Sequence, residues 1–469
     1  MLLLAKNGVV VHIIGIGGIG MSAIAQMLHF LNIRVQGSDT AHNDNVSRLR
    51  NNGIEVFVGH NANNLGNATY IIVSSAIKES NPELLEAKLR GIPIVTRAEV
   101  LAELTKGKTT IAISGTHGKT TTTALVGSIL EAASLDPTIM VGGILGDSNT
   151  NIRIGYSDYL VVEADESDGT FTQISRTIAV VTNINSEHLD FHGNFSNIQH
   201  SFLNFMQKIA FYGVIVACID HEDVRYVLSK VQNRAILTYG IKSNDANIQA
   251  INIQLLHNHS VFDVVVNQVA VMKNVRINVP GLHNILNALA GVAVSTRLGC
   301  SMQHIIDGIN KFTGVQRRFT LLGHTKNNIT IVDDYAHHPE ELICTIAAAR
   351  NFLTAQKLSG RLFVVFQPHK YSRLRDLFQE FIKCFHDVDY LFVAPVYSAK
   401  ETPIIGIDHK SLALSLQKTL CTAVCIEDFG ELYESLVPLL SRDDLVLFAG
   451  AGDITYWAHK FYDKILSQQ

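Results

Sequence analysis

Short continuous runs of β-branched and apolar residues recur along the chain, and segments of helical length with mixed polarity separate them. Val9–Ile14, Thr109–Ser114 and Leu362–Phe366 are three such runs, and a glycine-rich or polar segment follows each of them. Continuous apolar runs of this length are typical of strands buried on both faces of a parallel sheet. The pattern predicts an α/β protein built from strand–helix–strand units. It changes only between residues 235 and 279, where strands such as Ser260–Val266 alternate polar and apolar positions.

At 469 residues the chain is too long for a single hydrophobic core, and about 150 residues per domain predicts three domains. The first is expected to close near Leu104, and the third is expected to begin near Thr313. The predicted domains are therefore residues 1–104, 105–312 and 313–469.

The composition excludes several classes of protein. No run of about 18 apolar residues is present, and Met1–Lys6 resembles no signal peptide, so a membrane location is not expected. A net charge of −4 argues against a nucleic-acid partner. The six cysteines are scattered, and only Cys421 and Cys425 lie close together, without a histidine pair at zinc spacing. Buried free thiols in a cytoplasmic protein are predicted, rather than disulfides or a structural zinc site.

The segment Gly115–Thr123 lies between a predicted strand and a predicted helix and contains Gly-Lys-Thr. Glycines let backbone N–H groups approach phosphate oxygens, Lys119 adds a positive charge, and the hydroxyl of Thr120 can ligate Mg²⁺. The usual phosphate-loop pattern places its first glycine at position 113, where this chain has Ile113. Nucleotide binding is predicted, and the alternative is a strand–helix turn with an exposed lysine.

A second glycine-rich loop follows the first predicted strand. Gly15, Gly17 and Gly20 fit G-x-G-x-x-G, and Asp39 follows about 20 residues later. Such a loop binds a diphosphate at a helix N-terminus, and the acid binds a ribose hydroxyl. Both a dinucleotide and a UDP-sugar contain a diphosphate and a ribose. A purely structural glycine turn is the alternative.

Polar clusters follow further strands of the middle and third domains. Glu163–Asp168 and Asn183–Asp190 fall where open α/β sheets bind ligands, so one acid at a strand end is expected to hold Mg²⁺. Taken singly, Asp165, Glu166 and Asp168 favour a solvated acidic loop. Asn284 and Asn287 share a helix face, which suits a purine edge, although asparagine is also a common helix cap. In the third domain, Asp333–Pro339 and Gln367–Arg373 follow predicted strands and suit a small charged substrate. Arg317-Arg318 could reach a phosphate.

Taken in order along the chain, these segments resemble the Mur ligase family over essentially the full length. The resemblance rests on Gly15–Met21, Ser74–Ala76, Gly115–Thr123, Glu163–Asp168, Gly281–Asn287, Asp333–Pro339 and Gln367–Arg373. It implies an N-terminal Rossmann-like domain, a central P-loop mononucleotide-binding domain and a C-terminal Rossmann-like α/β domain. Gly-Thr-His-Gly-Lys-Thr is similar to this family's own phosphate loop, which accounts for the displaced first glycine.

The resemblance also implies the chemistry. It points to the alanine-adding branch: ATP-dependent ligation of L-alanine to the carboxylate of UDP-N-acetylmuramate through an acyl phosphate, with Mg²⁺, in peptidoglycan synthesis. Domain closure is then expected to gate turnover, and the protein is expected to be a monomer or weak homodimer whose partners are these small molecules. Three alternatives stay open: a recycling ligase that adds a tripeptide to the same sugar, an NAD-dependent oxidoreductase, and a nucleotide-sensing module without chemistry.

The roles that the resemblance implies fall into five sets. ATP is expected to contact Gly115, Thr116, His117, Gly118, Lys119, Thr120, Thr121, Asn284, Asn287, Arg318 and Asp334. The UDP-sugar is expected to contact Gly15, Gly17, Gly18, Gly20, Ser38, Asp39, His60 and Ser75. L-Alanine and the acyl phosphate are expected beside Tyr335, His337, His369 and Arg373. The metal ligands are Thr120, Glu163 and His188, and the catalytic residues are Lys119, Glu163, His188 and His337.

The chain departs from the family pattern at four places. Asn185 stands where an acid is common, and Glu187 stands where aspartate is common. Ala336 replaces a more usual glycine, and Glu340 replaces a more usual threonine. His188 itself is present. The departures therefore affect the expected metal geometry and not the expected reaction.

Overall fold

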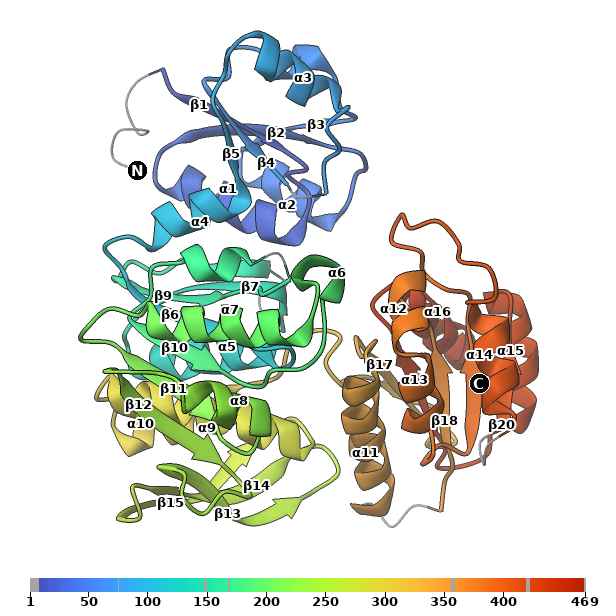
Figure 1. Ribbon diagram of the computed structural model, residues 1–469. Coiled ribbons are helices and arrows are strands. Elements are labelled where there is room, and N and C mark those ends of the chain that lie inside the picture. Colours follow the sequence, from blue (N-terminus) through green and yellow to red (C-terminus); the bar gives the residue numbers. More distant parts are fainter. Residues whose placement is uncertain are drawn as a thin grey trace. The chain divides into compact units, whose positions relative to one another are not determined.

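The computed structural model describes residues 8–74, 76–146, 150–167, 169–355, 359–418 and 422–467 (Figure 1). It contains three β-sheets of five, ten and six strands. The chain divides into two compact units, one of residues 1–250, 264–272 and 286–312 and the other of residues 251–263, 273–285 and 313–469.

The first sheet has the strand order β3-β2-β1-β4-β5, and the pairs that join its strands are parallel. β1 lies at its centre, and every residue of that strand is buried, including His12 in its otherwise apolar sequence. Its strands are β1 (Val10–Ile14), β2 (Arg34–Asp39), β3 (Glu55–Val58), β4 (Tyr70–Val73) and β5 (Ile94–Thr96). Its helices are α1 (Ile19–Phe30), α2 (Asp44–Asn51), α3 (Pro82–Leu89) and α4 (Arg97–Thr105).

The second sheet has the order β15-β14-β13-β12-β11-β10-β6-β9-β7-β8. Its strands are β6 (Thr109–Ser114), β7 (Thr138–Leu145), β8 (Thr150–Arg153), β9 (Tyr159–Glu163), β10 (Ile178–Val181), β11 (Val214–Cys218), β12 (Ala235–Gly240), β13 (Ile248–Leu255), β14 (Ser260–Val266) and β15 (Ala270–Ile277). The helices along this stretch are α5 (Lys119–Ala132), α6 (Leu189–His192), α7 (Phe195–Gln207), α8 (Glu222–Leu228), α9 (Leu282–Arg297) and α10 (Met302–Lys311).

The third sheet has the order β16-β17-β21-β18-β19-β20, in which only the β16–β17 pair is antiparallel. Its strands are β16 (Thr320–His324), β17 (Thr330–Asp334), β18 (Leu362–Phe366), β19 (Tyr390–Val393), β20 (Thr422–Cys425) and β21 (Leu445–Ala449). Its helices are α11 (Pro339–Ala355), α12 (Tyr371–Asp376), α13 (Phe378–Cys384), α14 (His409–Leu416), α15 (Phe429–Leu436) and α16 (Ile454–Ser467).

Both faces of the third sheet are covered. Val364 belongs to a core that includes α11, α13 and α14, whereas its neighbours Phe363 and Val365 belong to a second core with α15 and α16. Alternate residues of one strand therefore enter opposite layers, which is why β18 has no polar position.

The predicted α/β class is confirmed. The antiparallel edge strand β16 was not predicted, because its residues are mostly half exposed and form no apolar run. The cysteines in the described ranges are free, as predicted, but the predicted burial holds only for Cys218 and Cys384 and is wrong for the exposed Cys344. Among the described residues, no helix is both long and apolar enough to cross a membrane.

Candidate nucleotide and substrate sites

The strand that precedes the phosphate loop, β6, lies between β9 and β10, and both pairs are parallel. Three polar segments therefore begin at the same edge of the sheet, because parallel strands end together. They are the loop after Ser114, the acids from Glu163 onward, and the segment that begins with Thr182. The strand order brings together the clusters that the sequence places far apart.

The phosphate loop depends on two glycines with positive φ. Gly115 has φ of 137°, and a Cβ atom there would collide with the hydroxyl of Thr182. Gly118 has φ of 82°, and its Cβ would lie 2.6 Å from Oδ1 of Asn287. Neither position can hold a larger residue without a shift of the loop. The backbone N–H of His117 donates to Oδ1 of Asn183 at 2.7 Å, which ties the loop to the segment after β10.

The P-loop lysine is already bonded. Nζ of Lys119 lies 2.8 and 3.0 Å from the two carboxylate oxygens of Glu166 and 2.6 Å from the carbonyl oxygen of Gly115. Burial alone would lower the pKa of Lys119, but Glu166 and Asp165 outweigh it and raise that pKa. Burial raises the pKa of Glu166 to about 7, against the opposing effect of Lys119.

The solvated-loop interpretation is therefore wrong for Glu166, which is 3% exposed. This pair was not predicted, since its members lie 47 positions apart. The available signal is that Glu166 follows the end of a predicted strand, and the structure places that strand beside the P-loop strand. Asp168 lies outside the described residues.

The expected metal ligands come from three elements at this edge. Thr120 lies in the first turn of α5, and Glu163 ends β9, where its carboxylate accepts the N–H of Gly142 at 2.7 Å. His188 follows β10 with φ of 56°, and its Nε2 lies 3.8 Å from Oε2 of Glu187. Carboxylate and hydroxyl oxygens are the donors that Mg²⁺ prefers, so Thr120 and Glu163 suit that ion.

The other expected ATP contacts differ in their surroundings. Thr116 and Thr121 are each 7% exposed, and the hydroxyl of Thr116 accepts the N–H of Asn185 at 2.8 Å. Asn287 accepts a hydrogen bond from the hydroxyl of Thr122 at 3.1 Å. Asn284 instead donates to the carbonyl oxygen of Pro280 at 2.7 Å, at the start of its own helix. Asn284 therefore lies inside α9 as a donor to the preceding turn, and the structure does not show it as a helix cap.

In the first domain, Asp39 holds the glycine loop. Its Oδ2 accepts the N–H of Gly17 at 2.8 Å, and a Cβ on Gly17 would lie 2.9 Å from the same oxygen. Gly15 has φ of 82° and donates its N–H to the carbonyl oxygen of Ser38 at 2.8 Å. Gly18 is the N-cap of α1 and Gly20 lies in its first turn, so the loop opens onto a helix N-terminus.

Ser38 and His60 surround a buried glutamate that the sequence did not single out. The hydroxyl of Ser38 donates to Oε2 of Glu83 at 2.5 Å and lies 2.9 Å from Nδ1 of His60. Asn64 donates to Oε1 of Glu83 at 2.6 Å, and Nε2 of His12 lies 3.3 Å from Oε2. Burial alone would raise the pKa of Glu83, but the hydrogen bonds from His12, Ser38 and Asn64 lower it to about 2. Ser75, the remaining expected contact, lies outside the described residues.

In the third domain the four residues expected to contact L-alanine lie together. The rings of Tyr335 and His337 are 5.2 Å apart, and those of His337 and His369 are 5.6 Å apart. Nη1 of Arg373 lies 3.1 Å from Nδ1 of His369. Burial, with help from His337 and Arg373, lowers the pKa of His369 to about 3. At neutral pH this imidazole is uncharged and can accept a hydrogen bond.

Two further residues adjoin this cluster: Tyr397, which was not predicted, and Arg317, which was expected to reach phosphate. Tyr397 stacks on His369, with ring centres 5.5 Å apart and planes inclined by 10°. Arg317 lies over the ring of Tyr335 at 4.9 Å and donates to the carbonyl oxygen of Gly450 at 2.6 Å. The aromatic rings and guanidinium groups form a surface that suits a small anion.

The two nucleotide contacts expected from the third domain lie beside the same cluster. Arg318 also lies over Tyr335, at 5.2 Å. Asp334 is buried, and its carboxylate accepts the backbone N–H groups of Phe319 and Ala336 at 2.6 and 2.7 Å. Burial raises the pKa of Asp334 to about 6, although Arg318 and these two donors oppose the shift. In this structure Asp334 fixes the two segments that carry Arg318 and Tyr335.

Three family models match consecutive parts of the chain. The Mur ligase family catalytic domain matches residues 10–109, the Mur ligase middle domain matches residues 113–295, and the Mur ligase glutamate ligase domain matches residues 317–452. The chain belongs to the Mur ligase family. The family that the motifs predicted is thereby confirmed.

Individual Mur ligases resemble the chain over nearly its whole length. UDP-N-acetylmuramate–L-alanine ligase of Chelativorans sp. is 47% identical and covers 98% of both chains. The enzyme of the same name from Agrobacterium fabrum is 46% identical over 96% of this chain and 95% of its own. Among solved structures, the UDP-N-acetylmuramate-alanine ligase MurC of Thermotoga maritima matches with a TM-score of 0.82 and 29% identity, covering 98% of this chain and 99% of its own.

Proposed function

We propose that this Mur ligase joins L-alanine to the carboxylate of UDP-N-acetylmuramate with consumption of ATP, in peptidoglycan precursor synthesis. The observation that carries the proposal is the P-loop at the edge shared by β6, β9 and β10, in a chain 46–47% identical to ligases of that name. The loop supplies a site for a triphosphate, and the acid-bearing neighbour strand supplies oxygen ligands for a cation.

The reaction balances in two steps. A carboxylate oxygen of the sugar attacks the γ-phosphorus of ATP, the bond to the bridging oxygen breaks, and ADP leaves. The amine of L-alanine then attacks the acyl carbon, phosphate departs with the electrons of the C–O bond, and the nitrogen loses a proton. Phosphoryl transfer of this kind depends mainly on positioning and charge neutralisation.

Lys119 carries the main charge in the first step. Its Nζ exchanges the carboxylate of Glu166 for phosphate oxygens, while Gly115 and Gly118 let backbone N–H groups approach the same phosphates. Burial raises the pKa of Glu166 and Lys119 lowers it, so separation from Lys119 raises that pKa further and favours the protonated carboxyl, which does not repel the triphosphate.

Thr120 and Glu163 are the residues that would hold Mg²⁺, with His188 at a further metal position. A bound Mg²⁺ would neutralise charge on the phosphates. The N–H of Gly142, bonded to one carboxylate oxygen of Glu163, orients that carboxylate.

The first and third domains supply the two other substrate sites. The glycine loop at Gly15–Gly20 would hold the diphosphate of the UDP-sugar, with Ser38 and His60 near the uridine. Tyr335, His337, His369 and Arg373 would hold L-alanine, whose carboxylate suits Arg373 and Arg317. The domain ranges 1–104, 105–312 and 313–469, a monomeric or weakly dimeric state and a cytoplasmic location belong to this proposal and rest on the sequence.

A phosphate-release assay tests the proposal. Release from ATP should require both UDP-N-acetylmuramate and L-alanine, and mass spectrometry should detect the sugar–alanine amide. Competition between L-alanine and a peptidoglycan tripeptide separates the alanine-adding enzyme from a recycling ligase, because the recycling enzyme would prefer the tripeptide. Release that is independent of both substrates, or absent with both, would contradict the proposal.

A further inference from the structure

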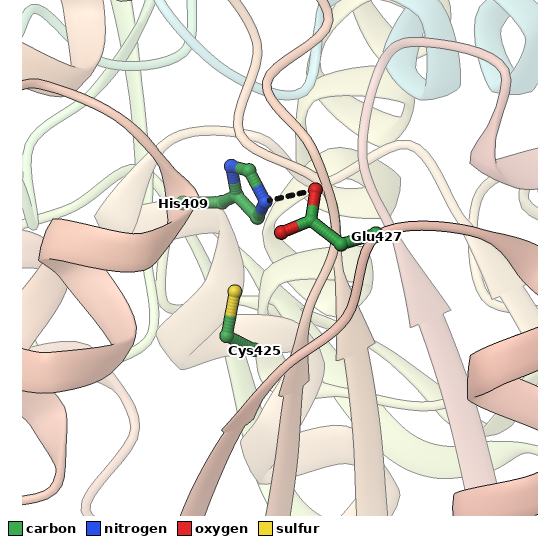
Figure 2. Close-up of side chains that lie close together, drawn as sticks. All are labelled: His409, Cys425 and Glu427. Atoms are coloured by element: carbon green, nitrogen blue, oxygen red, sulfur yellow. Dashed lines mark ion pairs between the residues drawn. The ribbon is translucent and has the colours of Figure 1, made fainter.

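His409, Cys425 and Glu427 form a cluster on the third domain, outside the sites described above. His409 begins α14, Cys425 ends the outer strand β20, and Glu427 lies in the turn before α15. Figure 2 shows the three side chains directed toward one another. One ligand atom from each lies within 4.8 Å of those of the other two. Among the described residues no other group of three such side chains meets this distance.

The histidine and the glutamate already have the spacing of metal ligands. Nε2 of His409 lies 3.4 Å from Oε2 of Glu427. Two ligands at about 2.1 Å from a tetrahedral ion lie about 3.4 Å apart, so both atoms can bind one ion without moving. Sγ of Cys425 lies within 4.8 Å of both atoms, so it needs to approach by at most about 1.2 Å to reach the roughly 3.6 Å that separates a tetrahedral sulfur ligand from its neighbours.

A second observation also indicates a ligand. His409 is 8% exposed, and its buried Nε2 makes no hydrogen bond of good geometry among the described residues. Its one near polar atom among these residues is Oε2 of Glu427 at 3.4 Å, too long or misaligned for a good hydrogen bond, and an ion between the two atoms would satisfy both. Figure 2 shows this nitrogen directed at the carboxylate of Glu427, with the sulfur of Cys425 beside the pair.

Neighbouring residues orient the ligands. Nζ of Lys410 lies 2.7 Å from Oε1 of Glu427, which leaves Oε2 on the side of His409. Asp408 caps α14 by accepting the N–H of Ser411 at 2.7 Å, and this bond fixes the helical turn that carries His409. Such outer contacts are a regular feature of metal sites in proteins.

The chemistry of the three donors selects the ion. Thiolate, imidazole and carboxylate together suit Zn²⁺, whereas Mg²⁺ and Ca²⁺ prefer oxygen ligands. A cavity of about 430 Å³, lined in part by His409 and Glu427, adjoins the cluster and has room for a water molecule. The sequence did not predict this site, because its histidine belongs to another element of the chain and forms no spaced motif with the cysteine.

We propose that His409, Cys425 and Glu427 bind one Zn²⁺ ion, with a water molecule from the adjoining cavity as fourth ligand. The thiol of Cys425 loses its proton to solvent on binding, so the thiolate and the carboxylate balance the charge of the ion. The ion joins the start of α14 to the end of β20. The proposal does not depend on the ligase activity.

Cobalt substitution tests the site in the full-length protein. Metal-free protein titrated with Co²⁺ should bind one ion that gives a sulfur-to-cobalt charge-transfer band and the visible bands of a tetrahedral site, and Zn²⁺ should displace it. Cys425→Ser should abolish the charge-transfer band, and His409→Gln should weaken Co²⁺ binding at least about tenfold. Cys344→Ser, which changes an exposed cysteine, is the matched control and should leave both bands unchanged.

The charge-transfer band separates this site from any cation site at the P-loop, where the expected ligands are oxygen and nitrogen. Absence of the band in the native protein would overturn the proposal, and so would a band that persists in Cys425→Ser. Circular dichroism checks that each variant is folded. If Cys425→Ser does not fold, the His409→Gln titration decides, since unchanged affinity there contradicts the site.

Discussion

Two buried glutamates, Glu83 in the first domain and Glu166 in the middle domain, have opposite electrostatic surroundings. Glu83 accepts hydrogen bonds from Ser38, Asn64 and the backbone N–H of Asn61, and its pKa falls to about 2. Glu166 has Lys119 as its principal partner, and its burial raises its pKa to about 7. Both carboxylates are almost inaccessible to solvent, so exposure does not distinguish them.

The two glutamates differ in the number of hydrogen-bond donors around the carboxylate and in the residues that they position. Several donors fix Glu83 as a permanent anion, which positions Ser38 and His60 beside the expected uridine site. One cation holds Glu166, and that cation is the lysine a triphosphate needs. The first arrangement stabilises a site before substrate arrives, whereas the second must be broken when substrate binds.

The largest expected effect comes from removing the cation itself. Lys119→Ala should lower turnover by about 10²–10³ in the phosphate-release assay, because a charged donor to the transition state is lost. Lys108→Ala is the matched control. Lys108 lies just before β6, and its Nζ bonds to Asp158 and to the carbonyl oxygen of Ser157, away from the proposed substrate sites. Near-normal turnover in Lys119→Ala would show that the lysine paired with Glu166 is not needed for the reaction.

Glu83→Gln tests the permanent anion. The pKa of about 2, against an ordinary value of 4.5, corresponds to about 3 kcal/mol of stability. Because the folded-state pKa is lowered, this contribution is complete above pH 4.5 and is lost as the pH falls toward 2. We expect faster hydrogen exchange in β1 and β2 of the variant at neutral pH, with a difference that shrinks below pH 4.5.

Glu79→Gln provides the control for that measurement. Glu79 is 85% exposed and pairs only with Lys88 among the contacts described, so its loss should leave exchange in β1 and β2 unchanged. Equal effects of the two substitutions would show that Glu83 has no special role.

Glu166→Gln tests the competing anion. We expect ATP to bind about tenfold more tightly, equivalent to about 1.4 kcal/mol, because Lys119 no longer has a charged partner to leave. The raised pKa means that native Glu166 becomes ionised as the pH rises through about 7. The ratio of native to variant Kd should therefore increase from pH 6 to pH 8, whatever the ionisation of ATP itself.

The control here is Asp158→Asn, which removes an exposed carboxylate paired with Lys108. Isothermal titration calorimetry at several pH values gives the ratio. Weaker ATP binding in Glu166→Gln, or a ratio that does not change with pH, would show that the pair does not compete with nucleotide.

The same two residues explain what sequence could and could not predict. Strands β6, β14 and β18 were predicted with their exact bounds, because buried strands have a continuous or alternating apolar pattern in neighbouring residues. The family followed from loops whose glycines and polar residues are local in sequence. The expected roles of individual site residues stay predictions.

The partners and the burial of Glu83 and Glu166 were not predicted, because these partners lie far away in the chain. Ser38 is 45 positions from Glu83, and Lys119 is 47 positions from Glu166. A glutamate near a helix start or in an acidic loop is ordinarily exposed, so its local pattern indicates solvent. Only the order of the strands, which no short motif contains, brings each pair together.

The smallest expected effect concerns an uncharged contact of the P-loop. Thr122→Val removes the hydroxyl that donates to Asn287, whose Oδ1 also lies beside Gly118. A neutral hydrogen bond contributes about 1 kcal/mol, so the KM for ATP should rise about fivefold with little change in kcat. Thr123→Val is the matched control, because that hydroxyl bonds within its own helix to the carbonyl oxygen of Lys119. If both variants raise KM equally, the effect comes from a change in α5 rather than from the lost contact with Asn287. The uncharged contacts of the P-loop would then not contribute to ATP binding, and the nucleotide site would differ from the site around Glu83 only in its charged groups.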